Sequence, residues 1–383
     1  MATNFEELRR RADLGDHAAL MKLAEELDRA QRPVETIEVL SRAANRGNVH
    51  ARFMVAVRLL IGYFVPVRAH DAVRLLSESS DQGHADATAV LAVLAGIGAY
   101  VEQDFDIALD LLARAAQLGS VHARAQLAVL SGDRVLADAA SRGNPPADFW
   151  ARLRKTIDAA SWTRAPKVVL LSESPRVGIV ENFVSAEICD WAIARSRGRL
   201  TRAEIYNAVS KDVEVSETRS NTTALFGLLE TDLVMAFIQA RMSAATGIPF
   251  DRMEAPAVLH YDPGEQITEH YDFVDPATPD YDQEIAGNGQ RICTFLVYLN
   301  DDYEGGETEF PKLGISHKGK KGEGLFFINA NAEGRADIRT EHAGRPPARG
   351  EKWIISQFIR SRPSTPGRDS DVTLRQVQQP RRR

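Results

Sequence analysis

Cysteine is scarce in this chain, with only Cys189 and Cys293 among 383 residues. Two cysteines cannot build a disulfide scaffold, and such sparing use is typical of proteins in a reducing compartment. No apolar run is long enough to span a bilayer, and the charged segment 1–11 lacks the apolar stretch of a signal peptide. We therefore expect a cytoplasmic protein without a secretory leader and without a membrane partner.

An excess of positive charge is also missing. The chain has 47 Lys and Arg against 53 Asp and Glu, for a net charge of −6. This balance gives no reason to expect nucleic acid as a partner. A hydrophobic content of 44% is ordinary for a globular protein, and 383 residues suffice for two domains.

A repeat occupies the first part of the chain, predicted to be one domain over residues 1–155. Its marks are a glycine after a helical segment and an alanine four residues later: Gly15 and Ala19, Gly47 and Ala51, Gly83 and Ala87, Gly119 and Ala123, Gly143 and Ala147. Glycine can end one helix in a left-handed cap, and the small alanine lets the next helix pack closely. A period in the thirties predicts an N-terminal α-solenoid of helical-pair repeats.

The repeat copies at 43–51 and 115–123 resemble the Sel-one-like branch of the tetratricopeptide-like repeats. Two roles stay open for them: binding a peptide or protein partner, or packing and oligomer formation. Histidines recur near the starts of the predicted helices, at His17, His50, His84 and His122. We interpret them as structural residues that do not converge on a metal.

The second part of the chain changes character. Residues 156–175 are predicted to be a linker, followed by a domain over 176–361 and a disordered tail over 362–383. Ser185 is a candidate N-cap for a helix up to Gly198, and a second helix is predicted over Asp232–Ala245. Many short strands after two helices favour an α+β domain with a double-stranded β-helix, or jelly-roll, core. Within it, residues 274–290 are expected to form a long flexible loop.

A candidate metal site lies in this second part. In a strand, side chains alternate between faces, so His270 and Asp272 would point the same way. With His342 from a neighbouring strand they would complete a two-histidine, one-carboxylate triad, which binds Fe(II) on one face and leaves positions open.

The ordered series around these residues resembles the prolyl 4-hydroxylase family of Fe(II)/2-oxoglutarate dioxygenases. The matching positions are Tyr261, Gly264, His270, Asp272, Arg291, Thr294, Tyr298, Leu299, Asn300, Gly305, Gly306, Glu307, Thr308, Phe310, His342, Gly344, Gly350, Lys352 and Trp353. The resemblance implies Fe(II), 2-oxoglutarate and O2 as cofactor and co-substrates, with ascorbate as reductant. It also implies that Lys352 and Tyr261 bind the distal carboxylate of 2-oxoglutarate, assisted by Thr294.

Departures from the family pattern lie on the substrate side. Ile267 replaces a usual tyrosine, Phe358 a usual tryptophan, Arg360 a common histidine, and Pro347 a usual valine. Oxygenase chemistry is therefore better supported than specificity for proline.

Three functions remain open at this point. The first is a hydroxylase of a prolyl or other residue in a peptide or protein that the solenoid binds. The second is a hydroxylase of a free amino acid or small metabolite, and the third is a non-catalytic interaction protein built on the repeats. The sequence leaves the substrate, the hydroxylated carbon and the oligomeric state undetermined.

Overall fold

The structure is a computed structural model of the chain. It describes residues 5–133, 145–146, 148–202, 204–207, 212–215, 219–278, 281–331 and 333–364, with backbone only for 204–207 and 212–215. These residues form two compact units. One reaches to Leu127 and includes α10, and the other takes in residues 128–133 and the described residues from Thr156 on. Across the described ranges, every helix is too short or too polar to cross a membrane.

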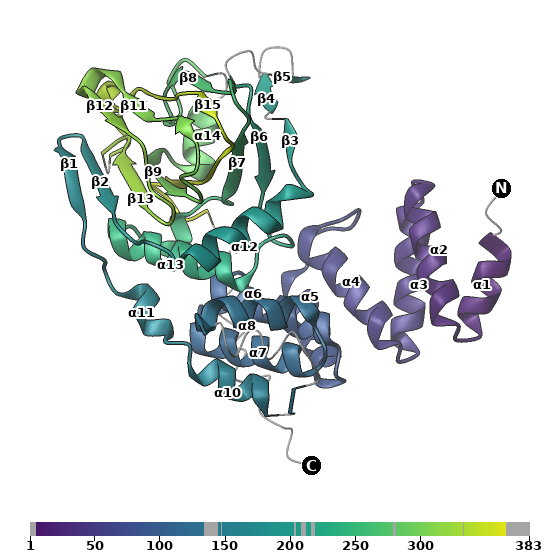
Figure 1. Ribbon diagram of the computed structural model, residues 1–383. Coiled ribbons are helices and arrows are strands. Elements are labelled where there is room, and N and C mark those ends of the chain that lie inside the picture. Colours follow the sequence, from purple (N-terminus) through teal and green to yellow (C-terminus); the bar gives the residue numbers. More distant parts are fainter. Residues whose placement is uncertain are drawn as a thin grey trace. The chain divides into compact units, whose positions relative to one another are not determined.

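The first unit is a stack of helices, shown in purple to blue in Figure 1. It comprises α1 (Phe5–Asp13), α2 (His17–Arg29), α3 (Pro33–Asn45), α4 (Val49–Ile61), α5 (Ala69–Asp81), α6 (Ala85–Ile97), α7 (Phe105–Gln117), α8 (Val121–Ser131) and α10 (Phe149–Lys155). From α1 to α7, each helix packs against the next one in sequence. This nearest-neighbour packing is that of a solenoid and confirms the predicted fold class.

The glycine–alanine repeat has a clear structural basis. Gly15, Gly47, Gly83 and Gly119 all have positive φ, between 85° and 105°, and the alanines four residues later are at most 2% exposed. The residue after each glycine accepts a hydrogen bond from that alanine's backbone N–H, through the side chains of Asp16, Asn48, His84 and Ser120. The glycine thus ends one helix, and its neighbour caps the next. The predicted fifth pair, Gly143 and Ala147, lies outside the described residues.

The second unit is built on two facing β-sheets. The larger has the order β1-β2-β13-β9-β16-β7-β6-β3 and the smaller the order β12-β11-β14-β8. The larger sheet contains β1 (Val169–Glu173), β2 (Arg176–Val180), β3 (Thr201–Arg202), β6 (Thr222–Leu225), β7 (Ala257–Tyr261), β9 (Arg291–Tyr298), β13 (Gly324–Ile328) and β16 (Lys352–Arg360). The smaller contains β8 (Ile267–His270), β11 (Thr308–Phe310), β12 (Ile315–His317) and β14 (His342–Gly344). Two short pairs complete the fold: β4 (Glu204–Asn207) with β5 (Asp212–Val215), and β10 (Glu304–Gly305) with β15 (Pro347–Arg349).

The core lies between these sheets. Leu296, Phe327 and Ile354 of the larger sheet pack in one buried cluster with Ile267 and Phe310 of the smaller sheet. Two packed antiparallel sheets around a single core are a jelly-roll arrangement, as predicted.

Two helices accompany the larger sheet: α12 (Ala186–Arg197) and α13 (Leu233–Thr246). In Figure 1 they run side by side along one side of the sheets. The Gln239 amide of α13 donates to the Gln357 side chain of β16 over 2.8 Å. Both helices were predicted, and Ser185 caps α12 as expected. In α13, Asp232 caps the start and Gly247 follows the end with positive φ.

Two segments differ from the sequence prediction. Residues 156–175, expected to be a linker, contain α11 (Ala159–Thr163) and the edge strand β1. In α11, Trp162 packs on Phe237 of α13, with ring centroids 5.4 Å apart. Most of the predicted tail, from 365 on, lies outside the described residues.

The segment 274–290 is also different, because it contains helix α14 (Tyr281–Asn288) in place of the expected continuous loop. Its two ends are joined by the Gln290 side chain, which accepts from the Val274 N–H over 2.6 Å and donates to the Val274 carbonyl over 2.8 Å. Arg360 pairs with Glu284 of α14 over 2.8 Å. Local polar contacts of this kind were not evident in a segment rich in Asp, Pro and Gly.

Candidate active site

Three predicted metal ligands meet at the edge of the smaller sheet. His270 ends β8 and lies opposite His342, the first residue of β14. Asp272 follows in a bend just after β8, so its side chain can turn between the two rings. Its Oδ1 is 3.4 Å from Nε2 of His270, and its Oδ2 is 3.4 Å from Nε2 of His342.

The backbone fixes which nitrogen each histidine presents. Nδ1 of His270 is 2.8 Å from the Thr268 carbonyl, and Nδ1 of His342 is 3.1 Å from the Thr340 carbonyl. A carbonyl only accepts, so each Nδ1 carries the proton when the ring is neutral. Both Nε2 lone pairs are therefore free for a metal, which is the usual orientation of ligating histidines.

A hydrogen-bond chain orients the carboxylate. The Thr294 hydroxyl of β9 donates to Oδ2 of Asp272 over 2.7 Å, and the Asn329 amide donates to the Thr294 hydroxyl over 2.8 Å. All three side chains are buried. Thr294 thus acts on the candidate ligand in this structure, while its predicted assistance to 2-oxoglutarate stays a prediction. Asn329 was missed because it lies far from the motif in sequence.

The electrostatics of the cluster suit a cation. Burial would raise the pKa of the Asp272 carboxyl, but the His342 and His270 imidazoles and the Thr294 hydroxyl hold that pKa well below its usual range. Burial lowers the pKa of His342 to about 4, against the attraction of Asp272. Burial also acts to lower the pKa of His270, but the hydrogen bond and charge of Asp272 outweigh it and raise that pKa. The cluster therefore offers one carboxylate and at least one neutral imidazole near pH 7.

These residues fit an Fe(II) ion. One ligand atom of each lies within 4.8 Å of the others, on side chains from two separate segments of the chain. Two imidazole nitrogens and one carboxylate are the donor set of the facial triad of non-haem Fe(II) oxygenases.

A cavity of about 650 Å³ connects this cluster to Lys352 and Tyr261. Tyr261 of β7 and Lys352 of β16 are paired residues, each 1% exposed, and both line the cavity. Burial lowers the pKa of the Lys352 ammonium to about 8, and the Glu307 carboxylate partly opposes this. Burial raises the pKa of the Tyr261 hydroxyl, which therefore stays protonated. A buried ammonium and a hydroxyl donor can together bind a carboxylate.

Strand β16 builds the cavity wall through its alternation. Lys352, Ile354, Ser356 and Phe358 line the cavity, whereas the intervening Gln357 contacts α13. Of the substituted family positions, Ile267 and Phe358 line the cavity. These two departures from the family pattern therefore change the side chains that line the cavity.

Arg360, another position that departs from the family pattern, takes part in a charge cluster beside the cavity. Arg291 and Arg360 both pair with Glu254, and the Arg291 guanidinium lies 3.9 Å from the centre of the Phe358 ring. Arg219, also in the cavity wall, has a buried Nε without a hydrogen-bond partner among the described residues. The cavity thus offers a cation beyond Lys352.

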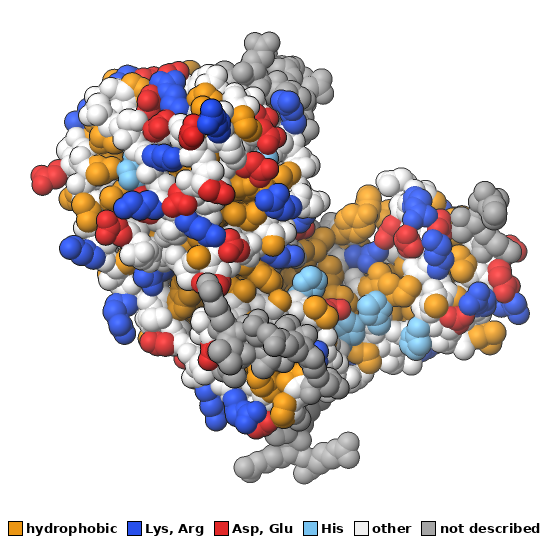
Figure 2. Space-filling model, in the orientation of Figure 1, with side chains coloured by type: hydrophobic (Ala, Val, Ile, Leu, Met, Phe, Trp, Pro, Cys, Tyr) orange, Lys and Arg blue, Asp and Glu red, His pale blue; other side chains and the backbone are white. Residues whose placement is uncertain are grey.

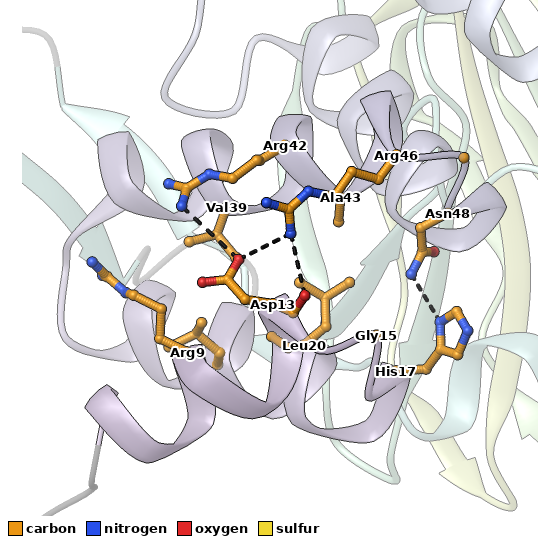
Figure 3. A pocket seen from close by; sticks show the side chains of 13 residues that line it. Arg9, Asp13, Gly15, His17, Leu20, Val39, Arg42, Ala43, Arg46 and Asn48 are labelled. Atoms are coloured by element: carbon orange, nitrogen blue, oxygen red, sulfur yellow. Dashed lines mark hydrogen bonds and ion pairs between the residues drawn. The ribbon is translucent and has the colours of Figure 1, made fainter.

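Two hollows mark the solenoid unit. One of about 300 Å³ lies between the first helices, where Arg42 and Arg46 approach the Asp13 carboxylate at 4.0 and 3.3 Å (Figure 3). Beside it, the Asn48 amide is 2.8 Å from Nδ1 of His17. The second hollow, of about 540 Å³, is lined by His17, His50 and His84 together with Leu20 and Met21. Figure 2 shows histidine side chains gathered on this unit.

The repeat histidines are interpreted as structural, and one pair of them makes a direct contact. Nδ1 of His50 is 2.9 Å from Nε2 of His84, and their rings stack with centroids 5.1 Å apart. Nδ1 of His84 caps α6 by accepting the Ala87 N–H, so Nε2 carries its proton and donates to His50. Successive repeats bring equivalent helix starts together, which one sequence copy does not reveal.

Comparisons with known proteins agree with this geometry. Residues 256–360 match the family model of the 2OG-Fe(II) oxygenase superfamily. The chain is 31% identical to the probable prolyl 4-hydroxylase 6 of Arabidopsis thaliana over 216 residues, which are 51% of this chain and 73% of that protein. It is 32% identical to the prolyl 4-hydroxylase subunit alpha-1 of Homo sapiens over 206 residues, 52% of this chain but only 38% of the human one.

Solved structures also match the two parts separately. A viral collagen prolyl hydroxylase from Paramecium Bursaria Chlorella virus-1, in complex with 2OG, is 29% identical, with a TM-score of 0.37 over 48% of this chain and 94% of that one. A Sel1 repeat protein from Oxalobacter formigenes is 19% identical, with a TM-score of 0.31 over 42% and 66% of the two chains. Because the match to the Arabidopsis protein spans nearly three quarters of it, we conclude that this chain belongs to the prolyl 4-hydroxylase-like 2OG-Fe(II) oxygenases.

Proposed function

We propose that this protein is an Fe(II)- and 2-oxoglutarate-dependent dioxygenase that hydroxylates a prolyl or other residue of a peptide or protein. The observation that carries the proposal is the single cavity with His270, Asp272 and His342 at one place and Lys352 and Tyr261 at another. Together they can bind a dicarboxylate between a metal and an ammonium. Ascorbate as reductant and a cytoplasmic location are further parts of the proposal.

Each residue has a separate task. Nε2 of both histidines and the Asp272 carboxylate would hold Fe(II), with the Thr268 and Thr340 carbonyls keeping the rings in place. Bound iron, 2-oxoglutarate and O2 supply the oxidising chemistry, with succinate and CO2 as co-products. Lys352 and Tyr261 orient the co-substrate. The apolar wall, including Leu259 and Ile354, excludes water from the reacting groups.

A peptide or protein substrate is supported by the repeats. The solenoid has two hollows, one with paired charges and one lined by histidines and apolar side chains. Helical-repeat proteins commonly use such extended surfaces for partners.

The second candidate is a hydroxylase of a free amino acid or another small carboxylate. It is favoured by Arg219, whose buried Nε lacks a hydrogen-bond partner within the described ranges and which lines the same cavity. If Lys352 binds 2-oxoglutarate, Arg219 is left for a second carboxylate. A peptide-bond carbonyl would satisfy this guanidinium less well than a carboxylate.

Substrate-dependent succinate release tests both functions. The full-length protein with Fe(II) is incubated with proline-containing peptides, the same peptides with alanine for proline, and free amino acids. Succinate formed with proline peptides alone supports prolyl hydroxylation, and mass spectrometry should find 16 Da added to the peptide. Succinate formed only with free amino acids supports the small-substrate function. The Asp272→Ala protein, without the carboxylate ligand, is the control.

A further inference from the structure

The tripeptide His-Tyr-Asp occurs twice in this chain, at 270–272 in the active site and at 260–262. The second copy lies at the end of β7, where the tyrosine faces the cavity and the histidine faces away from it. Tyr261 points into the cavity, so His260 lies on the opposite face of the sheet, against Trp353 of β16, with ring centroids 4.2 Å apart. This outer histidine has no role in the proposed reaction.

His260 is buried and incompletely bonded. It is 8% exposed, and its Nδ1 is 3.2 Å from the Thr222 hydroxyl. Its Nε2 is buried without a hydrogen-bond partner among the described residues. A polar nitrogen left unpaired in this way costs about 1–3 kcal/mol, so a missing partner is expected there.

Three carboxylates lie near that nitrogen, and those of Asp262 and Glu265 are close enough to His260 and to each other to share an ion with it. Nε2 of His260 is 3.4 Å from Oε2 of Glu351 and 3.8 Å from Oδ1 of Asp262. Asp262 and Glu265 each offer a carboxylate oxygen within 4.8 Å of it and of each other. Ligands about 2.0–2.2 Å from a tetrahedral ion are roughly 3.4 Å apart.

Other contacts in the cluster leave its negative charge largely uncompensated. Oε2 of Glu351 accepts from Nε1 of Trp353 over 3.0 Å and lies 3.7 Å from the Arg197 guanidinium. Oε2 of Glu265 accepts the Asp262 backbone N–H over 3.0 Å. Three carboxylates thus face one guanidinium, and a dication would balance them.

We propose that His260, Asp262 and Glu265 form a second metal site, beside Glu351, for a divalent ion of the zinc type. One imidazole and several carboxylates are ligands that zinc accepts in four-coordinate sites. Asp262 and Glu351 are 62% and 43% exposed, so the ion can enter from solvent. Bound there, it joins the end of β7 to the turn that follows it, directly behind Tyr261.

The test is zinc binding by full-length protein that lacks the active-site histidines. The double variant His270→Ala/His342→Ala is titrated with zinc chloride alone, and bound zinc is measured by calorimetry and by elemental analysis after desalting. The expected result is one zinc per chain. Adding His260→Phe, which keeps an aromatic ring against Trp353 but removes the nitrogens, should abolish that equivalent.

Two matched variants sharpen the result. His317 forms a complete pair with Glu323, 2.5 Å apart, so His317→Phe in the same double-variant background should still bind one zinc. Asp262→Asn, an exposed change, should weaken the zinc affinity of the double variant at least about tenfold, the lower range for a disturbed metal site. Circular dichroism checks that each variant is folded.

A protonated His260 paired with Glu351 is the competing explanation for the cluster. In that case the double variant binds no zinc, or it binds the same amount of zinc as the triple variant that also carries His260→Phe. Either result overturns the proposal. A second set of variants in the wild-type background guards against a double variant that fails to fold. There, His260→Phe should reduce two bound zinc ions to one, and a wild-type stoichiometry of one overturns the site.

Discussion

Lys352 and Tyr261 face each other across the pairing of β16 with β7, with the Lys352 Nζ 5.2 Å from the centre of the Tyr261 ring. The ammonium is 1% exposed, in a cavity that also contains the candidate metal ligands. A buried ammonium is stable only with a partner of opposite charge, or in its neutral form. Its titration should therefore be linked to binding of the co-substrate.

The affinity for 2-oxoglutarate should fall as pH rises above about 8. Burial lowers the pKa of Lys352 to about 8 in the free protein, so below that pH the side chain is already charged. Above it, the neutral amine must take up a proton before it can pair with a carboxylate. Calorimetry with the Mn(II)-loaded protein should show a Kd rising by at most about tenfold per pH unit, with proton uptake on binding.

Two substitutions at the same position control for other titrating groups. Lys352→Arg keeps its charge at every accessible pH, so its affinity should not fall over this range. Lys352→Ala should weaken 2-oxoglutarate binding by about 2–5 kcal/mol, because a carboxylate loses its partner in a dry site. An unchanged Michaelis constant for 2-oxoglutarate in Lys352→Ala would show that this lysine does not bind the co-substrate.

Removing one imidazole should remove the iron. His342→Ala is expected to lose stoichiometric Fe(II) binding and turnover while keeping its thermal melting within a few degrees of wild type. The His342→Ala protein and its reference protein both also carry His260→Phe, so that metal bound on the outer face is not counted. His317→Ala, on β12 outside the cluster, is the control and should retain iron. Full turnover with one iron per chain in the His342→Ala protein would contradict the ligand assignment.

Thr294 should influence the metal without binding it. Thr294→Val removes the hydrogen bond to Asp272 but keeps the shape of the side chain. We expect Fe(II) affinity to fall by about 10–100-fold, the usual effect of a lost outer contact to a ligand. Thr246→Val, at the end of α13, removes a comparable hydroxyl hydrogen bond far from the site and should leave iron affinity unchanged. Equal affinities in the two variants would refute the orienting role.

The solenoid should matter for a large substrate and not for the chemistry itself. Deletion of residues 1–155 keeps α11, which packs on α13. The remaining protein should still convert 2-oxoglutarate to succinate without substrate, but should hydroxylate a peptide or protein substrate more weakly. Its melting temperature and solubility must first show that it is folded. A folded fragment that hydroxylates its substrate at the full-length rate would exclude the repeats as a substrate-binding arm.

The sequence predicted the fold well because the fold depends on local patterns. The repeat glycines have the left-handed backbone that their spacing indicated. The His-x-Asp motif placed His270 and Asp272 together because both belong to one short segment.

What the sequence did not predict depends on contacts between distant segments. Asn329 reaches Asp272 only through Thr294, on another strand. Arg360 and Glu284 are brought together by folding, and this pair attaches the helix that was expected to be a loop. The His50–His84 contact likewise requires two successive repeats to stack.

Side chains on the two faces of strand β16 have different neighbours, so mutations on each face should affect different properties. Residues 352, 354, 356 and 358 face the cavity, whereas Trp353 and Gln357 face the outer layer. Substitution scanning along this strand should therefore give a pattern with a period of two, in which activity and thermal stability respond at alternate positions. A one-residue insertion near its start would exchange the two sets and remove both properties at once. Evolution can thus adjust substrate preference at Ser356 or Phe358 with little change to the packing behind them.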